Sequence, residues 1–337
     1  MTEADAIRLI HAGFPRPAAQ RNLPFECDAE LLALGNETWA LTVDEFSPAE
    51  DRFHLADRFY PAGAELLGAN LATATLSDLL AAGAVPELYL HAVCLPRDAD
   101  ERFVSGLADG IRGVLEAAGC RLCGGDMGSA AEWRYTGFAM GRVREGRALT
   151  HVLAPGPLRL WVTGRLGDAN AAAAQGLPAP RFETRVREAG IIHRHAASCI
   201  DTSSGFLDAL WLLHAVNPAR RIEVRVDRIP LDPAAARFGA AAGIPAAASL
   251  IGGAGEYELV FATPEALSGA AEDELAGAGA VEIGGVSGDP GAGLHLAWGD
   301  GRTAAVAGPP PCPRAAADHG SYVKAVLATA RALFEPR

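Results

Sequence analysis

The sequence predicts an α+β protein built from two domains. Helical and strand patterns follow one another irregularly, without the regular βαβ alternation of a parallel sheet. The chain has 337 residues, more than one ordinary core accommodates, and 50% of them are hydrophobic. The rigid turn Pro155-Gly156-Pro157 interrupts the pattern near the middle. We therefore expect an N-terminal α/β domain over residues 1–150 and a C-terminal α+β domain over residues 151–337.

The first half is expected to mix helices and strands. Apolar residues recur at helical spacing over residues 62–83 and 99–118, and Gly119 closes the second of these helices. Leu88–Leu95 alternates as a strand does and stops at Pro96. In order, the expected elements are helices at 4–12 and 28–34, a strand at Trp39–Val43, a helix at 62–83, a strand at Leu88–Leu95, a helix at 99–118, a strand from Arg121 to Cys123 running into a Gly124-Gly125-Asp126 turn, and a strand at Tyr135–Val143.

The second half shows shorter segments after the Pro-Gly-Pro turn. An alanine-rich stretch and an apolar stretch after Gly205 indicate helices, and alternating segments indicate strands. The expected strands are 158–163, 222–226, 257–262, 281–286 and 294–298, and the expected helices are 169–175, 206–215 and about 319–333.

Charge and hydropathy exclude several classes of function. The chain has 29 basic and 41 acidic residues, a formal net charge of −12, which would repel a nucleic-acid backbone. No stretch approaches the roughly 20 apolar residues needed to cross a bilayer. The acidic start Met1-Thr2-Glu3-Ala4-Asp5 lacks the positive charge of a signal peptide. We expect a cytoplasmic protein that binds neither nucleic acid nor membrane.

The lysine content restricts how the protein can handle phosphates. Lys324 is the single lysine in the sequence, and it lies near the C-terminus. A P-loop requires a lysine directly after its glycines, and a protein kinase requires one on a strand near its glycine-rich loop, so both motifs are excluded. If the protein uses ATP, then metal ions, backbone amides and arginines must neutralise the phosphates.

Four aspartates share one local pattern. Each stands at a strand end or a turn beside glycine, serine or threonine, and the four are Asp44, Asp78, Asp126 and Asp201. Magnesium prefers carboxylate oxygens together with substrate phosphates, and glycine lets a phosphate approach the backbone amides. Aspartate in such positions also caps helices and closes turns. The pattern alone leaves both interpretations open.

The order of six segments adds a family resemblance. The segments are Thr42-Val43-Asp44, Leu76-Ser77-Asp78 through Ala84-Val85-Pro86, Gly124-Gly125-Asp126, Val162-Thr163-Gly164-Arg165-Leu166-Gly167-Asp168, Ile200-Asp201-Thr202-Ser203-Ser204-Gly205-Phe206 and Gly253-Ala254-Gly255-Glu256-Tyr257-Glu258-Leu259. In this order they resemble the motifs of thiamine-monophosphate kinases in the PurM (aminoimidazole ribonucleotide synthetase) superfamily. The resemblance covers about residues 30–265.

The resemblance implies a PurM-like two-domain fold, a homodimer built on the N-terminal halves, and Mg²⁺-dependent use of ATP with a small-molecule acceptor. It implies metal ligation by Asp44, Asp78, Asp126 and Asp201, with Asn36 in the remaining family position, and catalytic roles for Asp78, Asp126 and Asp201. Nucleotide contacts are implied for Gly125, Asp126, His151, Ser203 and Ser204, and substrate contacts for Glu256 and Tyr257.

The chain departs from the family pattern at functional positions. The N-terminal Gly-Asp-Asp motif of the family corresponds to Gly35-Asn36-Glu37, and the second aspartate of Asp-x-Ser-Asp-Gly is replaced by Ser204. These replacements predict a metal site with two fewer negative charges. Three functions therefore remain open: a thiamine-monophosphate kinase, a paralogue acting on another small cofactor precursor, and a nucleotide-binding protein without catalysis.

Overall fold

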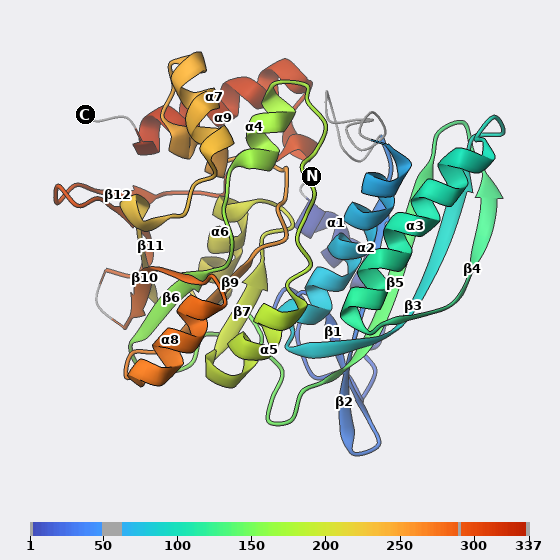
Figure 1. The fold of residues 1–337 in the computed structure, drawn as a ribbon. Helices are drawn as coiled ribbons and strands as arrows, with labels where there is room; N and C mark the ends of the chain where they lie inside the picture. Colours follow the sequence, from blue (N-terminus) through green and yellow to red (C-terminus); the bar gives the residue numbers. More distant parts are fainter. Residues whose placement is uncertain (1–2, 49–62, 289–290, 335–337) are drawn as a thin grey trace.

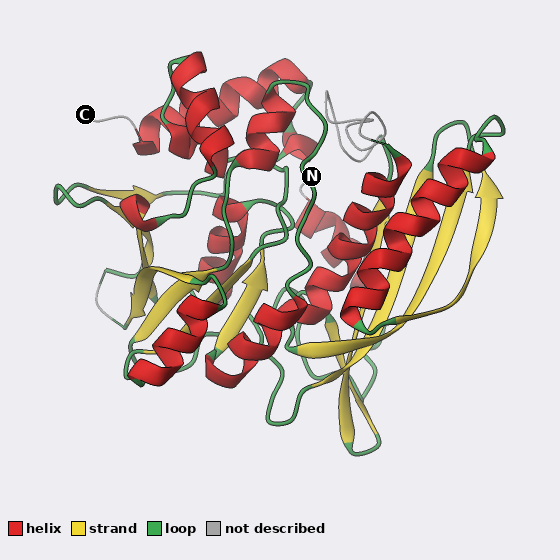
Figure 2. Ribbon diagram, viewed as in Figure 1, coloured by secondary structure: helices red, strands yellow, loops and turns green. Residues whose placement is uncertain are grey.

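The computed structural model describes residues 3–48, 63–288 and 291–334. Within these residues the chain forms one five-stranded and one seven-stranded sheet, each accompanied by helices (Figures 1 and 2). All strands of the smaller sheet precede residue 144, and all strands of the larger sheet follow residue 157. The structure is therefore a mixed α+β fold, as the sequence predicts.

The smaller sheet has the strand order β1-β2-β5-β3-β4. Its pairs are antiparallel except β3 with β4, which run parallel. Helices α2 and α3 lie side by side on one face (Figure 1). The bounds in this half are α1 Glu3–His11, β1 Glu30–Leu34, β2 Glu37–Phe46, α2 Ala64–Ala81, β3 Ala84–Leu95, α3 Glu101–Ala118, β4 Arg121–Ser129 and β5 Arg134–Val143.

Two glycines set the close packing of α2 on α3. A Cβ on Gly110 would overlap the carbonyl of Glu65, and a Cβ on Gly68 would overlap the carbonyl of Leu107. The helices therefore approach backbone to backbone. Such contact at both glycines fixes α2 against the sheet and leaves its far side free to meet the second half of the chain.

Two expectations for this half are wrong. Residues 28–34 contain good helix formers, yet Glu30–Leu34 forms strand β1, because pairing with β2 buries Leu31. The strand beginning at Arg121 does not turn at Gly124-Gly125-Asp126 but continues to Ser129 alongside β3. A register shift opposite Tyr89 and Leu90 accommodates the extra residue.

The larger sheet has the order β12-β11-β8-β10-β6-β9-β7. Helix α6 packs on one face within the main core of this half, and α5 and α8 pack on the other. The bounds are β6 Leu158–Val162, α4 Asp168–Ala174, α5 Val186–His195, β7 Ser198–Asp201, α6 Phe206–Val216, β8 Arg221–Arg225, α7 Pro233–Ala242, β9 Leu259–Pro264, α8 Gly269–Gly277, β10 Val281–Ser287, β11 Gly293–Ala297, β12 Thr303–Val306 and α9 His319–Phe334.

Helix α2 lies between the two halves. Its residues from Leu67 to Ala81 are all buried, as expected for a helix covered on every side. The Asn70 side chain donates to the Pro180 carbonyl at 2.9 Å and accepts from the Phe182 amide at 3.0 Å. These bonds tie a segment of the second half to α2, so the C-terminal end of α2, with Asp78, is held at the junction.

None of the helices in the described residues combines the length and the apolar composition that crossing a bilayer requires.

Candidate functional site

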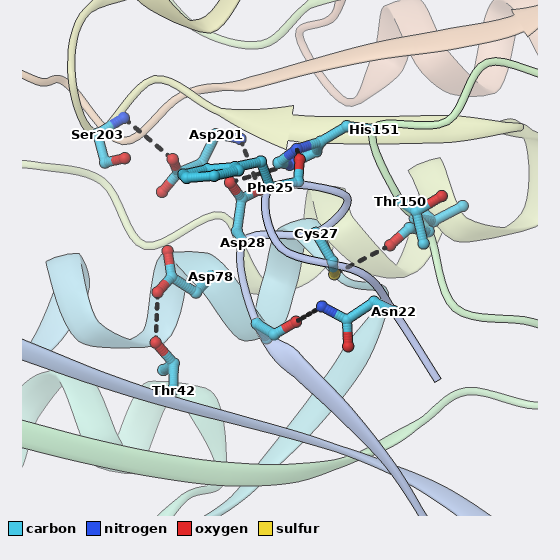
Figure 3. Close-up of polar contacts among 12 residues, drawn as sticks. Asn22, Phe25, Cys27, Asp28, Thr42, Asp78, Thr150, His151, Asp201 and Ser203 are labelled. Atoms are coloured by element: carbon cyan, nitrogen blue, oxygen red, sulfur yellow. Dashed lines mark hydrogen bonds and ion pairs between the residues drawn. The ribbon is translucent and has the colours of Figure 1, made fainter. Parts of the chain in front are cut away.

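Three carboxylates meet at the junction of the two halves. Asp28 comes from the loop before β1, Asp78 from the last turn of α2, and Asp201 from the end of β7. Each offers an oxygen, and these oxygens all lie within 4.8 Å of one another. Figure 3 shows the three side chains turned toward a common centre. We call Asp28, Asp78 and Asp201 the junction cluster.

Local geometry explains how Asp201 enters this cluster. One oxygen, Oδ1, accepts the amide of Ser203 at 3.0 Å, which closes a turn directly after β7. The other oxygen, Oδ2, is buried and makes no hydrogen bond of normal geometry among the described residues, although the Ser77 hydroxyl also acts on this carboxylate. The sequence left open whether Asp201 caps a turn or ligates a metal ion. In the structure Oδ1 caps the turn, and Oδ2 is available for a metal ion.

Asp28 and Asp78 are held by neighbouring polar groups. Oδ1 of Asp28 lies 3.1 Å from Nε2 of the buried His151, and Oδ2 accepts the Asp201 amide at 3.1 Å. On the opposite side, the Thr42 hydroxyl of β2 donates to Oδ2 of Asp78. Each half of the molecule thus contributes to fixing these acids.

Mutual repulsion and burial perturb the acids at the junction. Burial, followed by the charges of Asp201 and Asp28, raises the pKa of Asp44 to about 7. Burial and then Asp28 raise the pKa of Asp201 to about 6. The pKa of Asp78 is raised well above its usual value, first by burial and then by Asp44 and Asp201. The acids therefore resist ionisation in the protein alone.

The His151 imidazole lies beside this excess of acid. Burial favours the neutral form of His151, but the Asp28 carboxylate and the Phe25 carbonyl outweigh it and raise the pKa of the imidazole. Perturbed acids that share one buried space are typical of functional sites.

Strand register places Asp44 with the cluster and separates Asp126 from it. Asp44 pairs with Gly137, Gly137 with His91, and His91 with Gly125, so these residues share one face of the sheet. A Cβ on Gly137 would overlap the Thr75 side chain of α2, which identifies this face as the helix-covered one. Asp126 is the next residue along β4, so its side chain points to the opposite face, and it is exposed.

Asn36 also lies away from the cluster. It occupies the exposed turn between β1 and β2, where Leu34 pairs with Glu37. Asp28 lies beyond the other end of β1, about 20 Å distant at the usual rise per strand residue. The acid that lies at the junction is Asp28, eight residues before Asn36, and the motif resemblance did not single it out. The available signal was an acid directly before a strand, in Phe25-Glu26-Cys27-Asp28.

The residues expected to contact nucleotide fall in three places. His151 is 1% exposed and its ring contacts Asp28, so the ring is not accessible to a nucleotide. Gly125 lies in β4, where its Cα approaches the backbone of His91 closely. Ser203 and Ser204 directly follow Asp201, and Ser204 is exposed. Helix α6 begins two residues later without a side-chain cap, so its first amides face outward near the cluster.

The residues expected to contact substrate are buried. Oε1 of Glu256 accepts the amides of Gly167 and Ala169, which anchors the loop before α4. The Tyr257 ring packs on Phe182, with ring centroids 4.9 Å apart. The backbone of Tyr257 has a φ of 57°, uncommon for a bulky residue. In this structure the segment organises loops around Asp201.

The donor set fits a hard divalent cation. The cluster combines carboxylate oxygens from three separate elements with one buried oxygen that makes no hydrogen bond of normal geometry within the described residues. Asp44 adds a fourth carboxylate whose pKa responds to Asp28 and Asp201. A cation would neutralise the repulsion that raises these pKa values. Such a site could bind magnesium together with phosphate oxygens.

Comparisons with known proteins show what the chain is similar to. Residues 27–143 match the family described as AIR synthase related protein, N-terminal domain. A thiamine-monophosphate kinase from Pyrococcus horikoshii is 29% identical over 242 residues, covering 68% of this chain and 74% of that protein. One from Escherichia coli K12 is 29% identical over 287 residues, covering 79% and 80%.

Solved structures show the same fold over almost the whole chain. AaThiL complexed with AMPPCP and TMP is 20% identical, with a TM-score of 0.73, and covers 91% of this chain and 96% of that one. A thiamine-monophosphate kinase from Stenotrophomonas maltophilia is 25% identical, with a TM-score of 0.67, and covers 89% and 96%. The resemblance seen in the motifs thus extends to 68–79% of the sequence and to the fold.

Proposed function

We propose that this chain, a thiamine-monophosphate kinase-like protein of the AIR synthase-related superfamily, transfers the terminal phosphoryl group of ATP to a small acceptor with the help of Mg²⁺. The observation that carries the proposal is the meeting of Asp28, Asp78 and Asp201 within 4.8 Å at the junction. Because the sequence offers no phosphate-binding lysine motif, a bound cation is the best partner for both these acids and the phosphates.

The residues divide the work of the reaction. Asp28, Asp44, Asp78 and Asp201 would hold magnesium, which supplies charge neutralisation for the phosphates when bound. The free amides at the start of α6, next to Ser203 and Ser204, suit an anionic phosphate. The acceptor oxygen forms a bond to the terminal phosphorus of ATP as the bond to the ADP oxygen breaks. Positioning rather than covalent catalysis suffices for this transfer.

Thiamine monophosphate is the first acceptor to test. The predicted loss of two charges is reduced to one, because Asp28 supplies the acid that Asn36 lacks, whereas Ser204 remains neutral. Glu256 and Tyr257 act in this proposal through the loops they anchor. In this proposal other groups recognise the acceptor. Because these groups are not the family's substrate-side residues, a different small phosphate ester is the second candidate acceptor.

The test measures ADP release and Mg²⁺-dependent ATP binding. Wild type, Asp78→Asn and the control Asp109→Asn, an exposed acid of α3 paired with Arg112, are compared with and without magnesium. We expect Asp78→Asn to lose about a hundredfold or more of the rate and the control to match wild type. Equal ATP affinity and turnover in all three proteins would refute the proposal. Tight binding of Mg²⁺-ATP without turnover on any acceptor would show that the protein binds nucleotide but does not transfer phosphate.

We further propose that two copies pair through the helix-free face of the smaller sheet. Val43, Phe138 and Leu90 form one row across that face, and Val43 is 64% exposed. Met140 and Leu88 form a neighbouring apolar pair. An open apolar face of this kind favours association. Asp126 lies on the same face, so a second copy could bring it to a site that its own chain cannot reach.

Mixing two inactive variants tests this pairing. If Asp126 acts across the interface, Asp78→Asn and Asp126→Asn are each impaired, but a mixed dimer contains one site with both acids intact. We expect co-refolded or co-expressed variants to recover about a quarter of wild-type activity, from random pairing in which half the dimers carry one intact site of two. A monomer by light scattering at micromolar concentrations, or no recovery on mixing, would contradict the proposal.

A further inference from the structure

His151 contacts the segment from Phe25 to Asp28, which places Asp28 in the junction cluster. Its amide donates to the Glu26 carbonyl at 2.7 Å, and its ring Nδ1 lies 2.7 Å from the Phe25 carbonyl. Its Nε2 lies 3.1 Å from Asp28. One residue following the smaller sheet thus contacts three of the four residues from Phe25 to Asp28, as the close-up in Figure 3 shows for Phe25 and Asp28.

The backbone at His151 is itself anchored to the second half of the chain. The Asn217 amide donates to the His151 carbonyl at 2.7 Å, and Asn217 belongs to the end of α6 in the second half. The residue is 1% exposed. Because a carbonyl oxygen only accepts, Nδ1 carries a proton toward Phe25, and Nε2 can therefore pair with the Asp28 carboxylate only in the imidazolium form, which the raised pKa of His151 favours.

Phe25 supplies independent evidence that the segment is constrained. Its φ is +68°, a conformation that a bulky residue rarely adopts. A conformation of this kind costs free energy and persists only where its surroundings determine it. The bond from His151 to the Phe25 carbonyl acts on that peptide. Breaking it would let the chain relax and withdraw Asp28 from the cluster.

Both oxygens of Asp28 face groups that follow the smaller sheet in the chain. His151 holds Oδ1, and the Asp201 amide holds Oδ2. The lone pairs that remain are directed into the junction cluster. We propose that His151 is the positioning residue of the cation site, acting through Asp28 and the Phe25 turn rather than by touching nucleotide. This inference rests on the proposed function, since it concerns the same site.

The test compares cation binding in His151→Gln with a matched control. Gln fills similar space but lacks two opposed ring nitrogens. His193→Gln is the control, because His193 also bonds a carbonyl, that of Arg147, through its ring and is partly buried. Mn²⁺ affinity is measured by calorimetry and by electron paramagnetic resonance on the full chain. Outer-shell partners typically affect metal affinity 10–100-fold, so we expect that loss in His151→Gln and none in His193→Gln.

Two further readouts separate positioning from folding. In kinetics, His151→Gln should raise the KM for Mg²⁺-ATP and leave the KM for the acceptor unchanged. Adding Phe25→Gly to His151→Gln should recover part of the Mn²⁺ affinity, because glycine adopts positive φ without cost. A lower melting temperature with unchanged Mn²⁺ affinity would overturn the inference. If Asp78→Asn and Asp201→Asn also keep wild-type Mn²⁺ affinity, the proposed function fails first.

Discussion

Two groups of buried acids in this protein differ in what surrounds them. Glu258, at the start of the β9 region, lies in a complete set of donors: Nε of Arg185 bonds Oε2 at 2.7 Å, a second guanidinium nitrogen bonds Oε1, and the Thr163 hydroxyl also donates. The junction cluster contains acids that repel one another, with one buried oxygen of Asp201 making no hydrogen bond of normal geometry in the described part of the chain.

This difference in hydrogen-bond donors distinguishes an acid that stabilises the fold from acids that could ligate a cation. Burying a carboxylate is costly unless hydrogen bonds and an opposite charge compensate it. Glu258 comes closer to that condition within the protein, because Arg185 and Thr163 both bond its carboxylate, although burial still raises the pKa of Glu258. The junction acids meet it only in part, through His151 and Thr42. Their remaining need for positive charge is the physical basis for expecting a cation there.

We expect the largest change in the free energy of unfolding when either Glu258 or Asp201, a member of the junction cluster, is replaced by its neutral amide. Glu258→Gln and Asp201→Asn both remove one negative charge with little change of shape. Glu258→Gln leaves Arg185 without its charge partner and should destabilise the fold by about 3–5 kcal/mol. Asp201→Asn relieves repulsion and should stabilise the cation-free protein at pH 8, on the order of 2 kcal/mol, since each pKa unit is worth about 1.4 kcal/mol.

Urea unfolding in the presence of EDTA measures both free energies. Adding Mg²⁺ should stabilise wild type and Glu258→Gln by the same increment and leave Asp201→Asn unaffected. Destabilisation of similar size in both variants, with Mg²⁺ stabilising both, would show that the two groups of acids do not differ in kind.

Sequence reasoning located the main elements where periodicity was strong. Helices α2 and α3 and strands β3 and β5 follow apolar patterns long enough to identify, and all four are confirmed. The pattern misled at Glu30–Leu34, where residues with helix propensity form a strand, because pairing with β2 decides the outcome. The four-residue strand β7 was too short to produce a pattern, although it presents Asp201.

Part of the candidate site could be predicted from the sequence. Asp78 and Asp201 stood out by motif and meet at the junction, and the pKa of Asp44, also singled out by motif, responds to Asp201 and Asp28. Asp28 became visible only when β1 was seen to pair with β2. The face on which Asp126 lies depends on the register of β4 after its irregularity, and no local pattern reports that register. The bond between His151 and Asp28 joins residues 123 positions apart, so it too required the fold.

A smaller effect, the pH dependence of stability, sharpens the comparison further. The pKa of Asp44 is raised to about 7 and that of Asp201 to about 6, from the usual 3.8 of an aspartate. In the cation-free protein, the folded state therefore keeps protons that the unfolded state has released between about pH 4 and 7. Stability is then greatest below pH 4 for these groups and is lost as pH rises through 6 and 7.

Saturating Mg²⁺ should abolish this loss, because a bound cation favours the ionised carboxylates and lowers their pKa values. We expect the melting temperature in EDTA to fall by several degrees between pH 5 and pH 8, and to fall less in Mg²⁺. Burial raises the pKa of Asp208 to about 7, so Asp208 also lowers the stability as pH rises. Because Asp208 is not part of the junction cluster, Mg²⁺ should not reverse its contribution. Asp208→Asn should therefore remove the Mg²⁺-independent part and leave the Mg²⁺-dependent part intact. A pH profile identical with and without Mg²⁺ would mean that the junction acids are neutralised within the protein, as Glu258 is, and that the contrast between the two groups does not hold.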